Sequence, residues 1–109
     1  MLHDLVTEYQ RDGFAFRPGL LSAAESQVLV RETEHLLDGD RPADRFVLEK
    51  DGTTVRTIVN PHRFSDVFER LVAHPTLVGA AQELLDDEVY VFQLGVNNKA
   101  SFQIGRAHV

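Results

Sequence analysis

The sequence predicts an α+β fold in which helices and a β-hairpin precede a β-rich region whose main sheet lies mostly outside this chain. Three observations predict this fold class. Apolar residues recur at helical spacing in segments that begin with helix-capping residues. An Asp-Gly pair at 51–52 lies between two β-rich runs, which is a strong hairpin signal. Residues 88–99 alternate in the way that a long strand does.

The first half of the chain contains two predicted helices. Residues 2–12 place apolar side chains on one stripe, and Gly13 suits the position just past a helix end. Ser22 and Glu25 form a capping box, so a second helix begins there and runs to about Asp38. Its spacing predicts four buried side chains, namely Val28, Leu29, Leu36 and Leu37.

Two further helices are expected before the final strand. Ser65 is a suitable cap for a helical segment that continues to Val72. Pro75 fits the first turn of the next helix, because the N–H that proline lacks would have no helical partner there. Asp86 and Asp87 follow the last apolar residue of that segment and end it. Five aromatic residues are expected to lie in the core: Phe14, Phe16, Phe64, Phe68 and Phe92.

Strands are expected at four places, which are rich in β-branched and aromatic residues. Residues 14–16 form a short strand. Residues 45–49 and 53–59 form the hairpin. Residues 88–99 form the last strand, which would lack its sheet partners within this chain and leave an exposed edge.

The last strand has two unlike faces. One face is wholly apolar and consists of Tyr90, Phe92, Leu94 and Val96. The other face turns polar at Gln93, Asn97 and Lys99, and Gly95 leaves space between them. A core does not easily accept two amides and an ammonium group, because each of them needs a partner. The pattern therefore indicates a pocket for a small polar or anionic molecule.

Length and composition describe an ordinary small domain. The chain has 109 residues, of which 43% are hydrophobic and 26% charged. A net charge of −6 argues against a nucleic-acid surface, which needs clustered lysines and arginines. No apolar run approaches a membrane span, and the start is not a signal peptide. The absence of cysteine excludes disulfides and thiolate metal sites. We expect a cytoplasmic protein that binds a small molecule, in an oligomeric state that stays open.

The residues Ile104–Val109 resemble translated cloning DNA. In one frame, a widely used sequencing-library adapter encodes Ile-Gly-Arg-Ala-His-Val, and a stop codon follows. The alternative is a natural C-terminus that carries this hexapeptide by chance. Residues derived from cloning carry no information on the fold. We therefore expect residues 1–102 to be the N-terminal part of a longer protein, and residues 103–109 to be a non-native tail.

Five phrases of the sequence, in their order and spacing, are similar to one family. They are Tyr9-Gln-Arg-Asp-Gly-Phe-Ala-Phe16, Val55-Arg-Thr-Ile-Val-Asn-Pro-His62, His74-Pro-Thr-Leu-Val-Gly-Ala-Ala-Gln-Glu-Leu-Leu85, Val89-Tyr-Val-Phe-Gln93 and Asn97-Asn-Lys99-Ala-Ser-Phe102. Over roughly residues 7–102, the chain resembles the phytanoyl-CoA dioxygenase family, and within it the branch that contains the ectoine hydroxylases.

The resemblance implies the N-terminal helices and hairpin of a double-stranded β-helix, a jelly-roll or cupin-like barrel, cut off before most of that barrel. It implies iron(II) and 2-oxoglutarate, with hydroxylation of a small metabolite and decarboxylation of 2-oxoglutarate to succinate. It implies that Lys99 contacts 2-oxoglutarate, that Asn97 shapes the same site, and that Gln93 contacts the substrate. Asn98 departs from many relatives, which carry an aromatic or apolar residue there, but it lies on the opposite strand face.

The iron ligands that the resemblance implies lie outside this chain. Such enzymes hold iron with two histidines and one carboxylate, and the family supplies them as a His-x-Asp after the Asn-x-Lys strand and a later His. None of the five histidines here begins a His-x-Asp or His-x-Glu pair: His3, His35, His62, His74 and His108. No catalytic residue or metal ligand is assigned. The intact protein is expected to be an enzyme, and this chain alone is expected to be inactive.

Other interpretations remain open at this stage. Lys99 can be a solvated residue at a strand end, and Gln93 and Asn97 can bind neighbouring backbone at a sheet edge. The chain can be a small non-enzymatic binding domain, or part of a jelly-roll protein that has lost its iron site. A related halogenase is a further alternative, in which a small residue replaces the carboxylate ligand so that chloride can bind.

Overall fold

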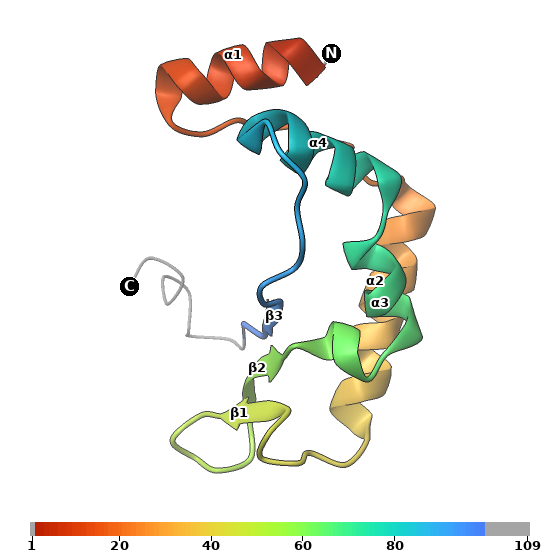
Figure 1. Cartoon of the computed structure of the whole chain (residues 1–109). Coiled ribbons are helices and arrows are strands. Elements are labelled where there is room, and N and C mark those ends of the chain that lie inside the picture. Colours follow the sequence, from red (N-terminus) through yellow and green to blue (C-terminus); the bar gives the residue numbers. More distant parts are fainter. Residues whose placement is uncertain (1, 100–109) are drawn as a thin grey trace.

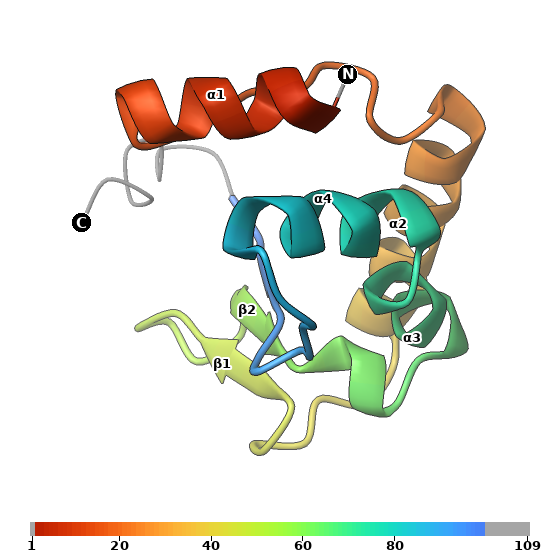
Figure 2. The same ribbon diagram turned by 45° about the horizontal axis from the view of Figure 1, so that its top comes forward.

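The computed structural model describes residues 2–99 and contains helices at its periphery and a small sheet at one end (Figure 1). The elements follow in the order α1 (Leu2–Asp12), α2 (Ala23–Asp38), β1 (Phe46–Leu48), β2 (Val55–Val59), the 3₁₀ turn η1 (Pro61–Arg63), α3 (Asp66–Val72), α4 (Pro75–Leu85) and β3 (Gly95–Asn97). Helix α1 lies along α4, and α2 packs beside α3 (Figure 2). This arrangement confirms the predicted α+β class.

All four predicted helices are present, because their start and stop signals are local. The Ser22 hydroxyl accepts the N–H of Glu25 at 3.1 Å, and the Glu25 carboxylate accepts the N–H of Ser22 at 2.8 Å. Helix α2 nevertheless contains no buried residue. Val28 is 46% exposed, so the prediction of its burial is wrong. The other three side chains predicted to be buried, Leu29, Leu36 and Leu37, are half-buried.

The predicted hairpin forms the first two strands of a three-stranded antiparallel sheet with the order β1-β2-β3. Gly52 lies in the connecting turn with φ 75°, a conformation that glycine adopts without strain. The core beneath the sheet consists of Phe46, Val55 and Ile58. Leu36 and Leu37 of α2 pack against this core, together with Phe64 and Val96. The hairpin and α2 therefore share one hydrophobic cluster.

Two strand predictions need correction. Only Gly95–Asn97 of the predicted strand 88–99 is a strand, because only these residues pair with β2. Residues 88–94 run from α4 to β3 without a strand beside them in the described part of the chain (Figure 1). Residues 14–16 are not a strand for the same reason. Alternation and β-propensity predict an extended backbone, whereas a ladder also requires a neighbour.

The prediction of an aromatic core holds only in part. Phe68 is buried at 3% exposure and Phe64 is half-buried. Phe14, Phe16 and Phe92 are 65%, 72% and 78% exposed, so their assignment to the core is wrong for the described residues. The implied jelly-roll barrel is also not contained in residues 2–99, whose sheet has three strands.

Candidate functional site

The candidate site lies on β3 and on the strand beside it. Asn60, just beyond the end of β2, binds Leu94 twice: its N–H donates to the Leu94 carbonyl at 2.7 Å, and its side-chain oxygen accepts the Leu94 N–H at 2.9 Å. Asn60 has φ 48°, a left-handed conformation that asparagine tolerates better than most residues. This double contact fixes the point at which the chain joins the sheet.

Asn97 lies opposite Thr57 in the antiparallel register. The Thr57 hydroxyl donates to the side-chain oxygen of Asn97 at 3.0 Å. A Cβ added at Gly95 would lie 3.6 Å from the Thr57 methyl carbon. Thr57, Gly95 and Asn97 therefore share one face of the sheet. Val96 packs into the core on the other face, which confirms the predicted alternation over this strand.

Asn98 lies on the strand face opposite to that of Asn97, and its role there is structural. Its backbone N–H donates to the Arg56 carbonyl at 2.9 Å, and its side-chain amide donates to the Val55 carbonyl at 3.0 Å. An aromatic or apolar residue could not make the second of these bonds. The residue that departs from the family pattern therefore adds a hydrogen bond between β3 and β2, and it leaves the face of Asn97 unchanged.

Gln93 and Lys99 lie outside β3, and both side chains are exposed. Gln93 lines an apolar groove of about 420 Å³ between the segment 88–94 and helices α3 and α4. Neither side chain forms a hydrogen bond or ion pair with another residue of the described range 2–99. The structure thus joins Asn97 to Thr57, and the roles of Gln93 and Lys99 stay predictions.

Sequence reasoning missed the contributions of Thr57 and Asn60. Asn60-Pro61 is a turn signal, and that signal could have placed Asn60 at the end of a strand. Nothing in the sequence pairs Thr57 with Asn97, because the two residues lie 40 positions apart and their contact depends on the register of β2 and β3. Register is a property of the assembled sheet and not of either strand alone.

No metal centre is present among the described residues, which contain no group of three or more histidine, cysteine or acidic side chains that could hold an ion. His62, in η1, is half-buried, and its Nδ1 has no partner in the described structure. His74 has a structural role instead. Its Nδ1 accepts the Thr76 N–H at the start of α4, and its Nε2 lies 2.5 Å from the Glu25 carboxylate.

The Glu25 carboxylate connects α2 with α4. The Ser22 backbone N–H and then His74 hold the pKa of Glu25 below its ordinary value. A carboxylate that accepts such bonds keeps its charge at lower pH.

In the described part of the chain, none of the helices combines the length and apolarity needed to cross a lipid bilayer.

Comparison with known proteins places the chain beside a group of oxygenases. No family model matches the sequence. The chain is 37% identical over 102 residues to L-proline trans-4-hydroxylase of Streptomyces griseoviridis. This alignment covers 94% of the present chain and 37% of the relative. The chain is also 35% identical over 97 residues to the ectoine dioxygenase of Halomonas elongata. That alignment covers 87% of the present chain and 29% of the enzyme.

Solved structures agree with these sequence matches. The iron-bound crystal structure of EctD from S. alaskensis superposes with a TM-score of 0.76 and 33% identity, over 84% of this chain and 34% of that one. The epimerase SnoN, in complex with Fe³⁺, alpha ketoglutarate and nogalamycin RO, superposes with a TM-score of 0.72 and 27% identity, over 92% of this chain and 40% of that one. The chain therefore spans about a third of the length of the relatives it matches.

Proposed function

We propose that this chain belongs to the phytanoyl-CoA dioxygenase family of iron(II)- and 2-oxoglutarate-dependent oxygenases, in its ectoine-hydroxylase-like branch. It forms the N-terminal part of a dioxygenase that hydroxylates a small metabolite. The observation that carries this proposal is the similarity to a proline hydroxylase over 94% of the chain. The proposal treats residues 103–109 as a non-native tail. It places the full-length protein in the cytoplasm.

The polar face of β3 supports the proposed binding of 2-oxoglutarate. Lys99 offers a compact ammonium group with three donors, which suits a carboxylate. Asn97 offers amide donors beside it on the predicted strand face. Gln93 is the proposed contact to the substrate. All three side chains are exposed in residues 2–99 and so accessible to a ligand.

Iron fits this part of the chain poorly, and its ligands are proposed to lie beyond the described residues. In the full-length protein the reaction would consume dioxygen and 2-oxoglutarate: one oxygen atom would enter the succinate that forms as carbon dioxide is released, and the other would enter the hydroxyl group of the product. The residues of this chain would bind and orient the dicarboxylate. The hydrogen bonds of Thr57 with Asn97 and of Asn60 with Leu94 would hold β3, and Gln93 and Lys99 lie in the chain on either side of it.

Epimerisation is a second candidate reaction, because the likeness to SnoN favours it. That protein is an epimerase crystallised with Fe³⁺ and alpha ketoglutarate. Iron therefore occurs in both of these structural relatives, EctD and the epimerase SnoN. Mass spectrometry of the product separates the two reactions, because hydroxylation adds one oxygen atom and epimerisation leaves the mass unchanged.

The test of the proposed function uses the gene recovered from its source DNA and sequenced past the codon for Phe102. An open frame with a His-x-Asp and a later histidine is expected. The full-length protein should form succinate in a reaction that requires iron(II) and 2-oxoglutarate, and this chain alone should form none. A genuine stop codon after Val109, or turnover by the chain alone, would contradict the proposal.

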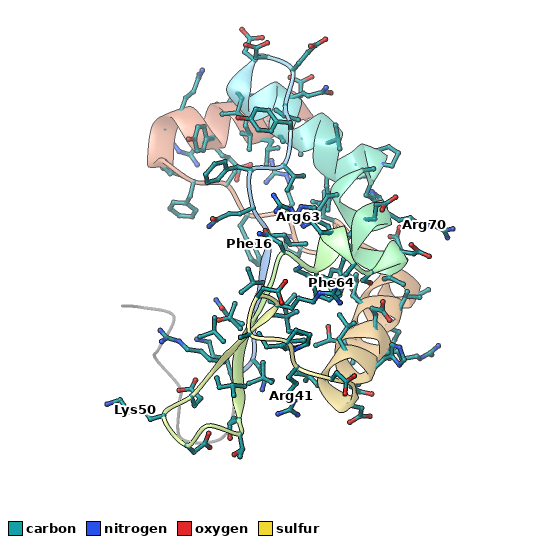
Figure 3. The ribbon with its side chains drawn as sticks, turned by 60° about the horizontal axis from the view of Figure 1, so that its bottom comes forward. Phe16, Arg41, Lys50, Arg63, Phe64 and Arg70 are labelled. Carbon is teal, nitrogen blue, oxygen red and sulfur yellow. The ribbon has the colours of Figure 1, made fainter. Side chains whose placement is uncertain are left out.

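Lys99→Ala in the full-length enzyme tests the proposed cosubstrate contact. We expect the KM for 2-oxoglutarate to rise by about 10-fold or more, because a hydrogen bond to a charged group contributes roughly 1.5–3 kcal/mol. Lys50→Ala is the matched control, since Lys50 lies exposed at the hairpin turn (Figure 3). Equal effects of the two substitutions would argue against a specific role for Lys99.

A further inference from the structure

We propose that Thr57 is a positioning residue for 2-oxoglutarate, which acts by fixing the orientation of the Asn97 side-chain amide. This inference rests on the proposed function, because it takes Asn97 to contact the cosubstrate. Its structural basis is the hydrogen bond in which the Thr57 hydroxyl donates to the Asn97 side-chain oxygen at 3.0 Å. The two residues lie directly opposite each other on β2 and β3.

The direction of this hydrogen bond determines what Asn97 presents to a ligand. An asparagine amide has one oxygen that accepts and one NH₂ group that donates twice. Because the oxygen accepts from Thr57, the NH₂ group is turned away from Thr57 and its donors are available. Both carboxylates of 2-oxoglutarate accept hydrogen bonds. The reversed amide would present an oxygen to an anion, which is an unfavourable contact.

Thr57 is itself well fixed. Threonine is branched at Cβ, so its χ1 angle has few allowed values. Thr57 is half-buried in the central strand of the sheet. The ladder between β2 and β3 and the two contacts of Asn60 with Leu94 hold the neighbouring strand in register. The hydroxyl can therefore orient Asn97 before a ligand binds, which lowers the entropy cost of binding.

Asn97 is otherwise exposed, and an exposed amide without this bond would sample both orientations. The gain from Thr57 is thus a gain in ligand affinity more than in the stability of the fold. Gly95, two residues before Asn97, presents no side chain that could cover the amide. The proposal therefore predicts that loss of the Thr57 hydroxyl weakens the binding of 2-oxoglutarate and changes the stability of the fold very little.

The experiment compares Thr57→Val with Thr57→Ser in the full-length protein. Valine keeps the shape and removes the hydroxyl, whereas serine keeps the hydroxyl. The dissociation constant for 2-oxoglutarate is measured anaerobically with iron(II). We expect about a fivefold increase for Thr57→Val, which is the loss of about one hydrogen bond, and a value near wild type for Thr57→Ser. The Tm should change little, and kcat at saturating 2-oxoglutarate should be unchanged.

Two further measurements make the assignment specific. The side-chain amide signals of Asn97 in ¹⁵N spectra should shift in Thr57→Val and stay in place in Thr57→Ser. In the Asn97→Ala background, Thr57→Val should cause no further loss of 2-oxoglutarate affinity. Asn97→Asp retains an acceptor for Thr57 and removes the amide donors, so it should weaken binding more than Thr57→Val does, and it remains informative if Thr57→Val fails to fold.

The inference is overturned if folded Thr57→Val binds 2-oxoglutarate as tightly as wild type, or if Thr57→Val weakens binding equally in the wild-type and Asn97→Ala backgrounds. Its failure is distinguishable from that of the proposed function. If Lys99→Ala weakens 2-oxoglutarate binding and Thr57→Val does not, only the inference on Thr57 fails. If full-length wild-type protein does not bind 2-oxoglutarate with iron(II), the proposed function fails.

Discussion

Asp51 holds the tip of the hairpin through hydrogen bonds with two neighbouring threonines. One carboxylate oxygen accepts the backbone N–H groups of Thr53 and Thr54, each at 2.9 Å, and the other accepts the Thr54 hydroxyl at 2.6 Å. These bonds, led by the Thr54 hydroxyl, lower the pKa of Asp51 from 3.8 to about 2. Asp51 therefore stabilises the hairpin only while it carries its charge.

This lowered pKa predicts the direction of a pH effect. A depressed carboxyl pKa gives a stabilisation that is complete above the unfolded value of 3.8 and is lost as the pH falls through about 2. The ¹³C shift of the Asp51 carboxyl should titrate near pH 2. Thr54→Val should raise that pKa toward 3.8, because it removes the largest cause of the shift. Thr53→Val is the comparison, because the Thr53 side chain is only the smallest cause of the lowered Asp51 pKa and its loss should raise that pKa less. An equal rise in both variants would contradict this account.

At the scale of elements, the α2 N-terminus connects the helices. Ser22 and Glu25 cap α2, and the Glu25 carboxylate also binds His74, whose ring caps α4. Ser65, the cap of α3, is buried at 5% exposure and donates from its hydroxyl to Glu32 of α2. The helix caps thus serve as contacts between helices. Loss of one cap should loosen a neighbouring helix as well as its own.

Ser22→Ala tests the role of the α2 cap. Removal of an N-cap hydroxyl costs about 1 kcal/mol, so the amides in the first turn of α2 should exchange with solvent about five times faster. Hydrogen exchange followed by NMR measures this change. Ser26→Ala is the control, because Ser26 is exposed inside the same helix. Similar exchange rates in the two variants would show that the cap contributes little.

The elements also show which features a sequence can predict. The capping box of α2 and the Asp-Gly turn of the hairpin depend on residues at most three or four positions apart, so local chemistry is sufficient. The length of β3 and the contact between Thr57 and Asn97 depend on which strand lies beside which. The polar face of β3 was therefore predictable from alternation, whereas its partner on β2 was not.

At the scale of the whole molecule, the described residues bury few apolar side chains. Seven are buried: Leu5, Phe46, Val55, Ile58, Pro61, Phe68 and Ala80. The radius of gyration is 15.8 Å, compared with about 13 Å for a compact domain of 100 residues. An open pocket of about 450 Å³ lies beside the contact of α1 with α4, and its lining includes Leu5, Leu20 and Leu84. Leu5, Phe68 and Ala80 lie outside the cluster beneath the sheet, so the buried side chains of the described residues do not form one continuous core.

This chain should consequently behave poorly in solution by itself. Leu85, Tyr90 and Phe92 are 65%, 86% and 78% exposed along the segment that leaves α4, and such contiguous apolar surface favours association. We expect a broad thermal transition, binding of a hydrophobic dye, and concentration-dependent association in sedimentation experiments. The full-length protein should instead melt cooperatively, because additional chain can cover this surface.

Tyr90→Ser together with Phe92→Ser should reduce association of the short chain, whereas Val28→Ser on α2 should not. A sharp, cooperative melt of a monomeric 109-residue chain would contradict this prediction and would favour the alternative of a small independent binding domain.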